Sequence, residues 1–320
     1  MSVCLLIILF IYDQKSYDRF HGKSDRIYRV VSDYKSPGFN SSEWFATSPA
    51  NLADILQRQY PGIENAVPVS TAFGGEAKHA NDIILPIQGF YTDPQFLQIF
   101  NFALLKGNPN TALSEPGSVI LTQETATKFY GDENAVGKTI QILGDRTYTV
   151  TGIIDNRVRT HFSFDALASY STLTATANKQ TVNWSDNFSN SYTYILMDEK
   201  AETENFKTRL SSAITPNFPE TTDEARINAF DLQPITTINL GRLLSNEIGT
   251  VMPAFAGYFL GGFALIIILI ACFNYISLTL ARSLNRSKEV SVRKVLGAYR
   301  FNIIKGDRLI LSNNLFLRLF

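Results

Sequence analysis

A basic segment near the C-terminus contains the residues of this 320-residue chain whose types and spacing best suit a specific interaction. Residues 282–300 carry six lysine and arginine side chains and one acid, Glu289. A helical spacing of i, i+3, i+4 and i+7 relates four apolar residues among them, namely Val292, Val295, Leu296 and Tyr299. An apolar stripe with charged flanks is what a helix needs to dock in a groove of a partner protein. Composition alone leaves a simpler alternative open, a juxtamembrane helix that its basic residues hold to anionic lipid.

Residue types that could hold a metal ion or perform catalysis are sparse and scattered. The histidines His21, His79 and His161 show no metal-ligand spacing, and both cysteines, Cys4 and Cys272, lie in apolar runs. The sequence contains no serine-hydrolase elbow, no zinc-protease helix and no phosphate-binding loop. We therefore expect a non-catalytic protein with no metal and no cofactor of its own. A formal net charge of +0 gives no indication of nucleic-acid binding.

The basic segment directly follows an apolar one. No aspartate, glutamate, lysine or arginine lies between Glu247 and Arg282, and residues 255–280 within that gap are long enough to cross a bilayer as a helix. The alternative is a buried core helix of a soluble protein, but such helices seldom run this long without a charge. Gly257 and Gly261 have the small-xxx-small spacing of helix-packing faces in membranes, which predicts a packing role for both.

Charge placement predicts how the chain crosses the membrane. The basic residues after residue 281 place that side in the cytoplasm by the positive-inside rule, so residues 13–250 are expected to be extracytoplasmic. Residues 3–12 form a second apolar run, which is too short to span and lacks the basic start and cleavage site of a signal peptide. We expect this run to be the outer part of a first membrane helix. The tail, residues 301–320, is interrupted by charges and makes no clean span.

The middle of the chain has the mixed pattern of an α/β domain. Strands are predicted where β-branched and aromatic residues cluster, at residues 26–33, 66–70, 118–122, 139–143, 146–155 and 191–197. Helices are predicted at residues 51–60, 94–100, 124–130 and 202–214. Ser48 and Pro49 are expected to cap and begin the first of these helices, which would make residues 26–70 a β-α-β unit. Gly131 is expected to end the third helix.

Four segments resemble one protein family, in the order in which that family has them. ARSLNRSKEVSVRKVLGAYR, residues 281–300, resembles the signature after the second membrane helix of FtsX-like permeases. These are the membrane subunits of ABC transporters of the macrolide-exporter (MacB-like) and lipoprotein-releasing types. SYDRFHGKSDRIYRV, residues 16–30, resembles the start of the MacB-like periplasmic domain in large permeases of Bacteroidetes-type bacteria. GSVILTQETATKFYGDENAVGKTI (residues 117–140) and YTVTGII (residues 148–154) resemble two further segments.

This resemblance implies an α+β chain with an extracytoplasmic mixed α/β domain, the MacB-like periplasmic core, between transmembrane helices. It divides the chain into part of a first transmembrane helix (residues 1–12), the periplasmic core (13–250), a second transmembrane helix (251–281), a cytoplasmic coupling helix (282–300) and an atypical tail where a third transmembrane helix starts (301–320). The family has a complete first membrane helix and continues into a third and a fourth. We therefore expect a product truncated at both ends.

The resemblance also implies partners. In the family the coupling helix docks on an ABC-type ATPase subunit, and that subunit rather than the permease binds ATP. The residues that stand at the positions of this signature are Glu289, Val290, Val292, Arg293, Lys294, Gly297, Ala298 and Arg300. The residues that we expect to couple to the ATPase are Glu289, Val292, Arg293, Lys294, Val295, Leu296, Gly297 and Ala298. Because such permeases work in pairs of halves, a second permease half or a second copy is also an expected partner, in the inner (plasma) membrane.

Two other classes of protein stay open. A membrane-anchored sensor with an extracytoplasmic ligand-binding domain would need a signalling domain beyond the membrane, and no linker toward one is visible. An enzyme held by two membrane anchors would need a nucleophile with a base, and no such set stands out.

Overall fold

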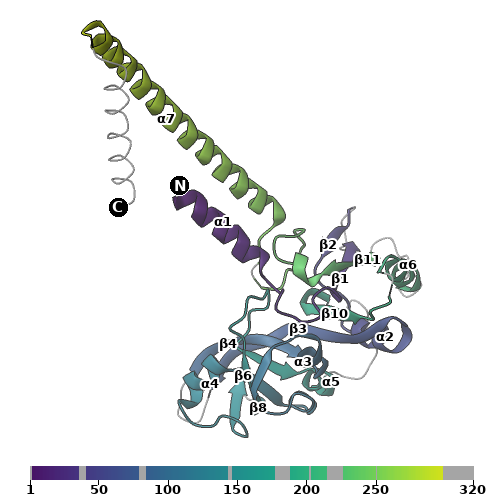
Figure 1. Ribbon diagram of the computed structural model, residues 1–320. Coiled ribbons are helices and arrows are strands. Elements are labelled where there is room, and N and C mark those ends of the chain that lie inside the picture. The colour runs from purple at the N-terminus through teal and green to yellow at the C-terminus, as the bar shows by residue number, and fades with distance from the viewer. Residues whose placement is uncertain are drawn as a thin grey trace. The chain divides into compact units, whose positions relative to one another are not determined.

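The computed structural model describes residues 2–35, 41–78, 84–142, 146–176, 188–201, 203–214, 226–249 and 251–297. The chain divides into two units. The first, Phe10–Tyr258, contains a mixed α/β domain, and the second, Met1–Leu9 with Phe259–Phe320, is helical over most of its described part. Figure 1 shows the elements along the chain.

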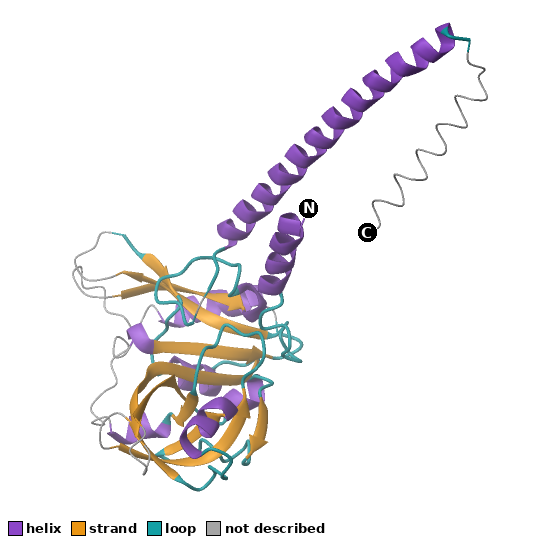
Figure 2. Ribbon diagram, turned by 90° about the vertical axis from the view of Figure 1, so that its left-hand side faces the viewer, coloured by secondary structure: helices purple, strands orange, loops and turns teal. Residues whose placement is uncertain are grey.

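Eleven strands in the described part of the chain join into one sheet, drawn in orange in Figure 2. The strands are β1 (Ile27–Lys35), β2 (Glu43–Phe45), β3 (Ile63–Lys78), β4 (Ile84–Thr92), β5 (Ala103–Lys106), β6 (Ser118–Thr122), β7 (Thr139–Ile142), β8 (Arg146–Asp155), β9 (Ala166–Ser169), β10 (Ser191–Met197) and β11 (Arg226–Pro234). The helices are α1 (Ser2–Lys15), α2 (Leu52–Gln59), α3 (Gln95–Ile99), α4 (Gln123–Tyr130), α5 (Ser171–Thr176), α6 (Thr203–Ile214) and α7 (Ala254–Val295).

The strand order is β11-β1-β10-β3-β4-β9-β6-β8-β5, with β2 beside β1 and with β7 beside β3 and β8. Most neighbours are antiparallel, and the pairs β4–β9 and β6–β8 are parallel. The 16-residue strand β3 pairs with β10 along residues 63–70 and with β4 along residues 69–78. One long strand therefore connects the two halves of the sheet.

Three apolar clusters hold the domain together. The first is rich in aromatic rings, with centroids 4.7 Å apart for Phe96 and Phe100 and 5.0 Å apart for Phe100 and Phe162. The second lies around α4 and β8, and the third joins α2 and α6 to the sheet. Because burying one such side chain stabilises a fold by about 1.5–3 kcal/mol, these clusters fix the elements that carry the polar residues described below.

Several elements agree with the sequence predictions. The bounds of β6 and β10 are those predicted, and α4 and α6 begin within one residue of their predicted starts. Gly131 ends α4 with a positive φ of 61°, a conformation that glycine adopts without the cost that a Cβ adds. Phe206 and Leu210 are both buried, as their shared helix face predicts. The predicted hairpin is formed by β7 and β8, and its turn at residues 143–145 lies outside the described residues.

The predicted cap of the first domain helix is wrong. Helix α2 begins at Leu52, and its N-cap is Asn51 rather than Ser48. The Ser48 hydroxyl is buried and donates to Thr193 Oγ1 on β10 at 2.9 Å. The hydroxyl that was expected to cap the helix therefore bonds to a strand instead. Such a partner, 145 positions away, cannot be found from local sequence.

The predicted β-α-β unit is present in an altered form. Strands β1 and β3 run in the same direction, but β10 lies between them and is antiparallel to both. The unit is therefore a split β-α-β, in which a strand from the second half of the chain fills the gap. Strands β2, β4, β5, β9 and β11 were not predicted.

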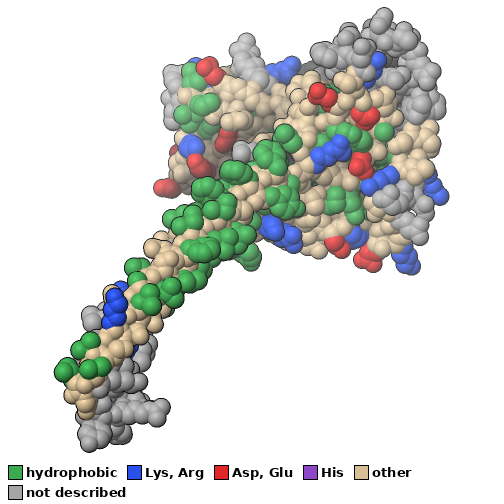
Figure 3. Space-filling view, turned by 90° about the horizontal axis from the view of Figure 1, so that it is seen from above, with side chains coloured by type: hydrophobic (Ala, Val, Ile, Leu, Met, Phe, Trp, Pro, Cys, Tyr) green, Lys and Arg blue, Asp and Glu red, His purple; other side chains and the backbone are tan. Residues whose placement is uncertain are grey.

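Helix α7 is a continuous 42-residue helix, and its residues from Phe259 onward belong to the second unit. Its segment Ala254–Lys288 is the one helix within the described residues that is long and apolar enough to cross a membrane, and its most apolar stretch has a mean hydropathy of 2.4. Hydrophobic side chains cover its surface along most of its length (Figure 3), and only 6% of its most apolar stretch is buried in the structure. Helix α1 is also apolar but has only 14 residues, fewer than the about 20 that a span requires.

Candidate functional site

The last three turns of α7 carry most of the predicted coupling residues. Val292 and Val295 are 58% and 87% exposed, and Leu296, which follows the helix, is 80% exposed. The described part of the chain thus leaves these large apolar side chains largely exposed, which is the state expected of a surface that a partner covers. Glu289, Arg293 and Lys294 lie on the same helical stretch.

Gly297 ends this helical stretch. Its φ of 85° lies in the left-handed region, and the N–H of the preceding Leu296 donates to the carbonyl of Val292 at 3.0 Å. A glycine in that conformation just past the last turn is a common helix end. Gly297 therefore sets where this helix stops, whereas Ala298 lies outside the described residues.

The two glycines predicted to pack within the membrane have different surroundings. A Cβ on Gly257 would stand 3.0 Å from Leu240 Cδ2, so the absence of a side chain lets the first turn of α7 lie against the loop before it. A Cβ on Gly261 would meet nothing within 4 Å. The packing of these residues against another membrane helix stays a prediction.

A buried aspartate ties the turn after α1 to the body of the domain. The Asp18 carboxylate accepts hydrogen bonds from Thr160 Oγ1 at 2.7 Å and from the backbone N–H of His161 at 3.2 Å. His161 Nδ1 lies 2.9 Å from the same carboxylate, and the N–H of Asp18 donates to the carbonyl of Arg159 at 2.8 Å. Burial alone would raise the pKa of Asp18, but the charge and hydrogen bonds of His161 outweigh it and hold this pKa well below its usual range.

Two histidines that are far apart in sequence meet at this carboxylate. His161 Nε2 lies 2.8 Å from the hydroxyl of Tyr194 on β10, and His21 Nε2 lies 3.8 Å from Asp18 Oδ1. Burial lowers the pKa of His21, which favours its neutral form. His21 Nδ1 accepts a hydrogen bond from the N–H of Asn101, so the neutral ring carries its proton on Nε2. No group of three or more potential metal ligands was found in the described part of the chain.

A buried ion pair connects β1 to the loop that leads into α7. Arg29 is fully buried, and its guanidinium donates to both carboxylate oxygens of Glu247, at 2.7 and 3.1 Å. The same guanidinium donates to Gln233 Oε1 on β11 at 2.6 Å. Burial alone would lower the pKa of Arg29, but Tyr194 and Glu247 raise it, so the group stays charged. Bidentate geometry of this kind fixes orientation as well as distance.

Hydrogen bonds also join the last turn of α1 to the start of α7. The Asn239 side chain donates to the carbonyl of Gln14 at 2.9 Å, and its Oδ1 accepts from the N–H of Met252 at 2.9 Å. The N–H of Ala254, the first residue of α7, donates to the carbonyl of Gly241 at 2.9 Å. Asn239 is buried, so these bonds are shielded from competition with water.

We call these residues the membrane-proximal network. It consists of Asp18, Arg29, His161, Tyr194, Asn239 and Glu247. It fixes the domain ends of α1 and α7 to the sheet. The Tyr194 hydroxyl lies beside His161, but both side chains are buried. Local sequence could not indicate this network, because its partners are separated by 143 positions for Asp18 and His161 and by 218 for Arg29 and Glu247.

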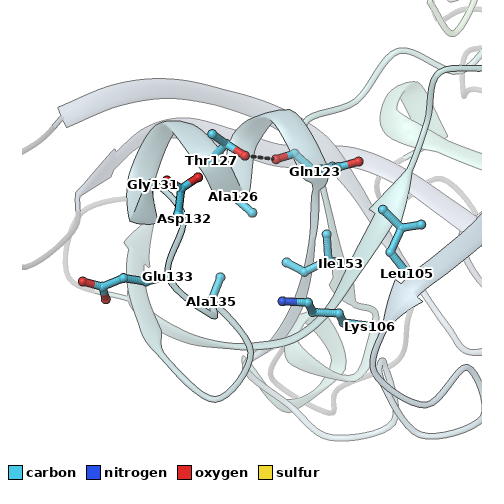
Figure 4. Close-up of a pocket in the computed structure, with 10 residues that line it drawn as sticks. All are labelled: Leu105, Lys106, Gln123, Ala126, Thr127, Gly131, Asp132, Glu133, Ala135 and Ile153. Atoms are coloured by element: carbon cyan, nitrogen blue, oxygen red, sulfur yellow. Dashed lines mark hydrogen bonds between the residues drawn. The ribbon is translucent and has the colours of Figure 1, made fainter.

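A surface pocket of about 290 Å³ lies between α4, β5 and β8 (Figure 4). Lys106 and Glu133 line it, but the Lys106 amine donates to Asn134 Oδ1 at 3.2 Å and Glu133 pairs with Lys138. The Thr127 hydroxyl donates to the carbonyl of Gln123 within its own helix. Lys106, Glu133 and Thr127 thus have partners, and the residues that line the pocket include no nucleophile beside a base.

Comparison with protein families gives one match. The model of the MacB-like periplasmic core domain matches residues 1–213, well over half of the chain. No curated protein matches the chain significantly.

Solved structures share the fold at low sequence identity. A domain assigned to a permease protein from Porphyromonas gingivalis superposes with a TM-score of 0.58 at 18% identity, covering 68% of this chain and 92% of that one. The periplasmic region of MacB from Actinobacillus actinomycetemcomitans gives a TM-score of 0.48 at 16% identity, covering 70% and 95%. At these identities the likeness to the first structure establishes the fold.

Proposed function

The chain belongs to the family of MacB-like periplasmic core domains, and on this premise we propose that it is a permease subunit of a MacB-, FtsX- or Lol-type ABC transporter. In this proposal it transmits ATP-driven motion of a partner ATPase to its periplasmic domain, for export or release of a substrate. The family match and the apolar helix together indicate a membrane-anchored protein with an extracytoplasmic domain of the ABC-transporter permease type.

The observation that carries the proposal is the continuity of α7. At 1.5 Å per residue its 42 residues extend about 63 Å, whereas the hydrocarbon core of a bilayer is about 30 Å thick. The uncharged residues 254–281 account for the span, and residues 282–295 continue for about 21 Å without interruption. A helix that is unbroken across this boundary can carry a displacement from one side of the membrane to the other.

The basic end of α7 is the proposed contact with the ATPase. We assign Glu289 and Arg293 to contacts with charged groups of the ATPase, and Val292, Val295 and Leu296 to a groove on its surface. The 58–87% exposure of those three apolar side chains supports a partner on this face. The ATPase binds and hydrolyses the nucleotide, so the permease itself needs no cofactor and performs no catalysis.

The membrane-proximal network is the proposed point at which the motion enters the domain. Arg29 and Glu247 fix the loop that precedes α7 to β1, and Asn239 links that loop to α1. A displacement of α7 would therefore move the edge of the sheet rather than a free linker. A second permease half or a second copy completes the proposed transporter in the inner membrane, with residues 13–250 in the periplasm.

Co-purification with the cognate ATPase tests this function. The full chain, solubilised in detergent, should retain the ATPase, and the double variant Glu289→Lys with Val292→Asp should lose it, because it reverses one charge and buries another in the groove. At 100° per residue, position 287 lies on the side of the helix away from Glu289 and Val292. Ser287→Asp adds a negative charge there and serves as the matched control. Equal capture by the double variant and the wild type would contradict the docking assignment.

A further inference from the structure

A small pocket lies where α1 and α7 approach each other within the first unit. Its volume is about 130 Å³, and it is lined by Ile11, Lys15, Leu240, Ala254, Gly257 and Tyr258. Since one water takes about 30 Å³ of liquid, the space holds a group of roughly four waters in size. That is enough for one small polar group such as a phosphate ester, and too little for a whole lipid or a drug-sized molecule.

The pocket has one charged residue among the six that line it, Lys15. Lys15 has no ion pair with any described residue. Arg19, four residues later, has none with a described residue either, and its Nε donates to the carbonyl of Lys15. The nearby acid Asp13 is already paired with Arg159 at 2.7 Å. The positive charge at this pocket is therefore not neutralised by the described part of the protein.

The start of α7 adds to this potential. Ala254, the first residue of the 42-residue helix, lines the pocket, and the N-terminal end of a helix carries a partial positive charge. The remaining walls are apolar, from Ile11, Leu240 and Tyr258. A free phosphate ion would meet too few donors here, whereas an amphiphile with an anionic head satisfies both the amine and the apolar walls.

The residues around the pocket are of the types found at the depth of lipid headgroups. Lys15 comes three residues after Tyr12, where the apolar run of α1 ends, and Tyr258 stands near the start of the uncharged part of α7. Tyr12 and Tyr258 are 74% and 81% exposed, and exposed tyrosines beside apolar helices are typical of the membrane interface.

We propose that this pocket binds the phosphate of an anionic phospholipid from the outer leaflet of the membrane that α7 crosses. The site rests on the membrane-anchored state of the chain and is independent of ATPase docking. A zwitterionic lipid is disfavoured because its ammonium group would approach Lys15 and the positive end of α7. A lipid held here would fix the level at which both helices leave the domain.

Native mass spectrometry of the full chain tests the site. The chain is released from detergent micelles that contain equal amounts of phosphatidylglycerol and phosphatidylcholine of the same chain length. The wild type should retain phosphatidylglycerol in preference. Lys15→Gln should weaken that retention about fivefold, since one cation near a membrane surface contributes on the order of 1 kcal/mol to binding an anionic lipid. Lys15→Arg should keep it, because the charge remains.

Lys200→Gln, at an exposed position outside the pocket, is the matched control and should retain phosphatidylglycerol as the wild type does. The proposal is wrong if Lys15→Gln retains as much phosphatidylglycerol as the wild type. It is also wrong if Lys15→Gln and Lys200→Gln lose the same amount of phosphatidylglycerol. It is also wrong if added inorganic phosphate displaces the lipid, because the pocket would then be a site for a free anion. Capture of the ATPase, measured on the same preparations, should not change in any of these variants.

Discussion

At the scale of single residues, the buried pair of Arg29 and Glu247 offers a direct measure of how firmly the loop before α7 is held. Glu247→Ala leaves a charged guanidinium buried without its carboxylate partner, so the free energy of unfolding should fall by about 3–5 kcal/mol. Urea unfolding of the full chain in detergent, followed by fluorescence, measures the change. Replacing both partners, in Arg29→Met with Glu247→Leu, should recover most of the loss.

A solvent-exposed pair serves as the control for that experiment. Asp54 and Arg58 approach to 3.6 Å on α2 with both side chains about three-quarters exposed. Asp54→Ala should change the free energy of unfolding by less than about 1 kcal/mol, since exposed pairs contribute little. If Glu247→Ala costs no more than Asp54→Ala, the loop before α7 is not held by its buried charge.

Asp93, which precedes α3, gives a prediction about pH. Burial raises its pKa to about 7, and the charge of Asp54 adds to the effect. The folded domain thus binds this proton more tightly than the unfolded chain does, so the stability it contributes is present below the ordinary aspartate pKa and is lost as the pH rises through about 7. In the wild type, Asp93 Oδ1 accepts a hydrogen bond from the N–H of Gln95 at 3.1 Å. The side chain of Asp93→Asn is neutral at every pH and keeps an oxygen that can accept the same bond.

Thermal unfolding at pH 5 and pH 8 checks this prediction. The melting temperature of Asp93→Asn should exceed that of the wild type at pH 8, and the difference should shrink at pH 5. Comparing the two proteins at each pH removes the contribution of His21, whose lowered pKa acts in the opposite direction. Asp132→Asn, at an exposed position, should show no such pH-dependent difference. If the melting temperatures of Asp93→Asn and the wild type differ by the same amount at both pH values, the pKa of Asp93 is not raised.

At the scale of elements, local signals predicted local structure and failed where the partner is distant. The β-branched run of β6 and the capping signals of α4, which Gly131 ends, are contained in a few consecutive residues, and both elements were placed correctly. Ser48 was misassigned because its real partner, Thr193, lies on β10. The contact between Asp18 and His161 depends on the fold as a whole, and no spacing rule identifies it.

Helix α7 as an element carries the proposed motion, so breaking it should uncouple binding from movement. Ala281→Pro removes one backbone hydrogen bond where the apolar part of the helix ends, and a proline inside a helix costs about 3 kcal/mol and kinks it. The variant should still capture the ATPase, because residues 289–296 are unchanged. It should lose the ATP-driven fluorescence change of a dye attached at Leu243→Cys, with Cys4 and Cys272 replaced by serine.

Ala281→Ser is the matched control for the kink, since serine changes the side chain at the same position without removing the backbone N–H. It should bind the ATPase and respond to ATP as the wild type does. An Ala281→Pro protein that responds to ATP as fully as Ala281→Ser would show that motion does not pass through an unbroken α7.

At the scale of the whole molecule, the family assignment and the extracytoplasmic domain were both expected from four segments of the sequence, and the family model confirms the assignment. The coupling role of residues 289–298 stays a prediction, because their partner is a separate protein. The membrane-proximal network could not be expected from the sequence, and it links α1 and α7 to the sheet.

The central claim is that ATP hydrolysis by a partner moves the periplasmic domain through α7, and one measurement tests it most directly. The full chain, labelled with a dye at Leu243→Cys in the serine background and reconstituted with its cognate ATPase, is followed by fluorescence while ATP is added. We predict a change that requires hydrolysis and is absent from the double variant Glu289→Lys with Val292→Asp. A change of the same size in that variant, or no change in the wild type while the ATPase is bound, would contradict the account.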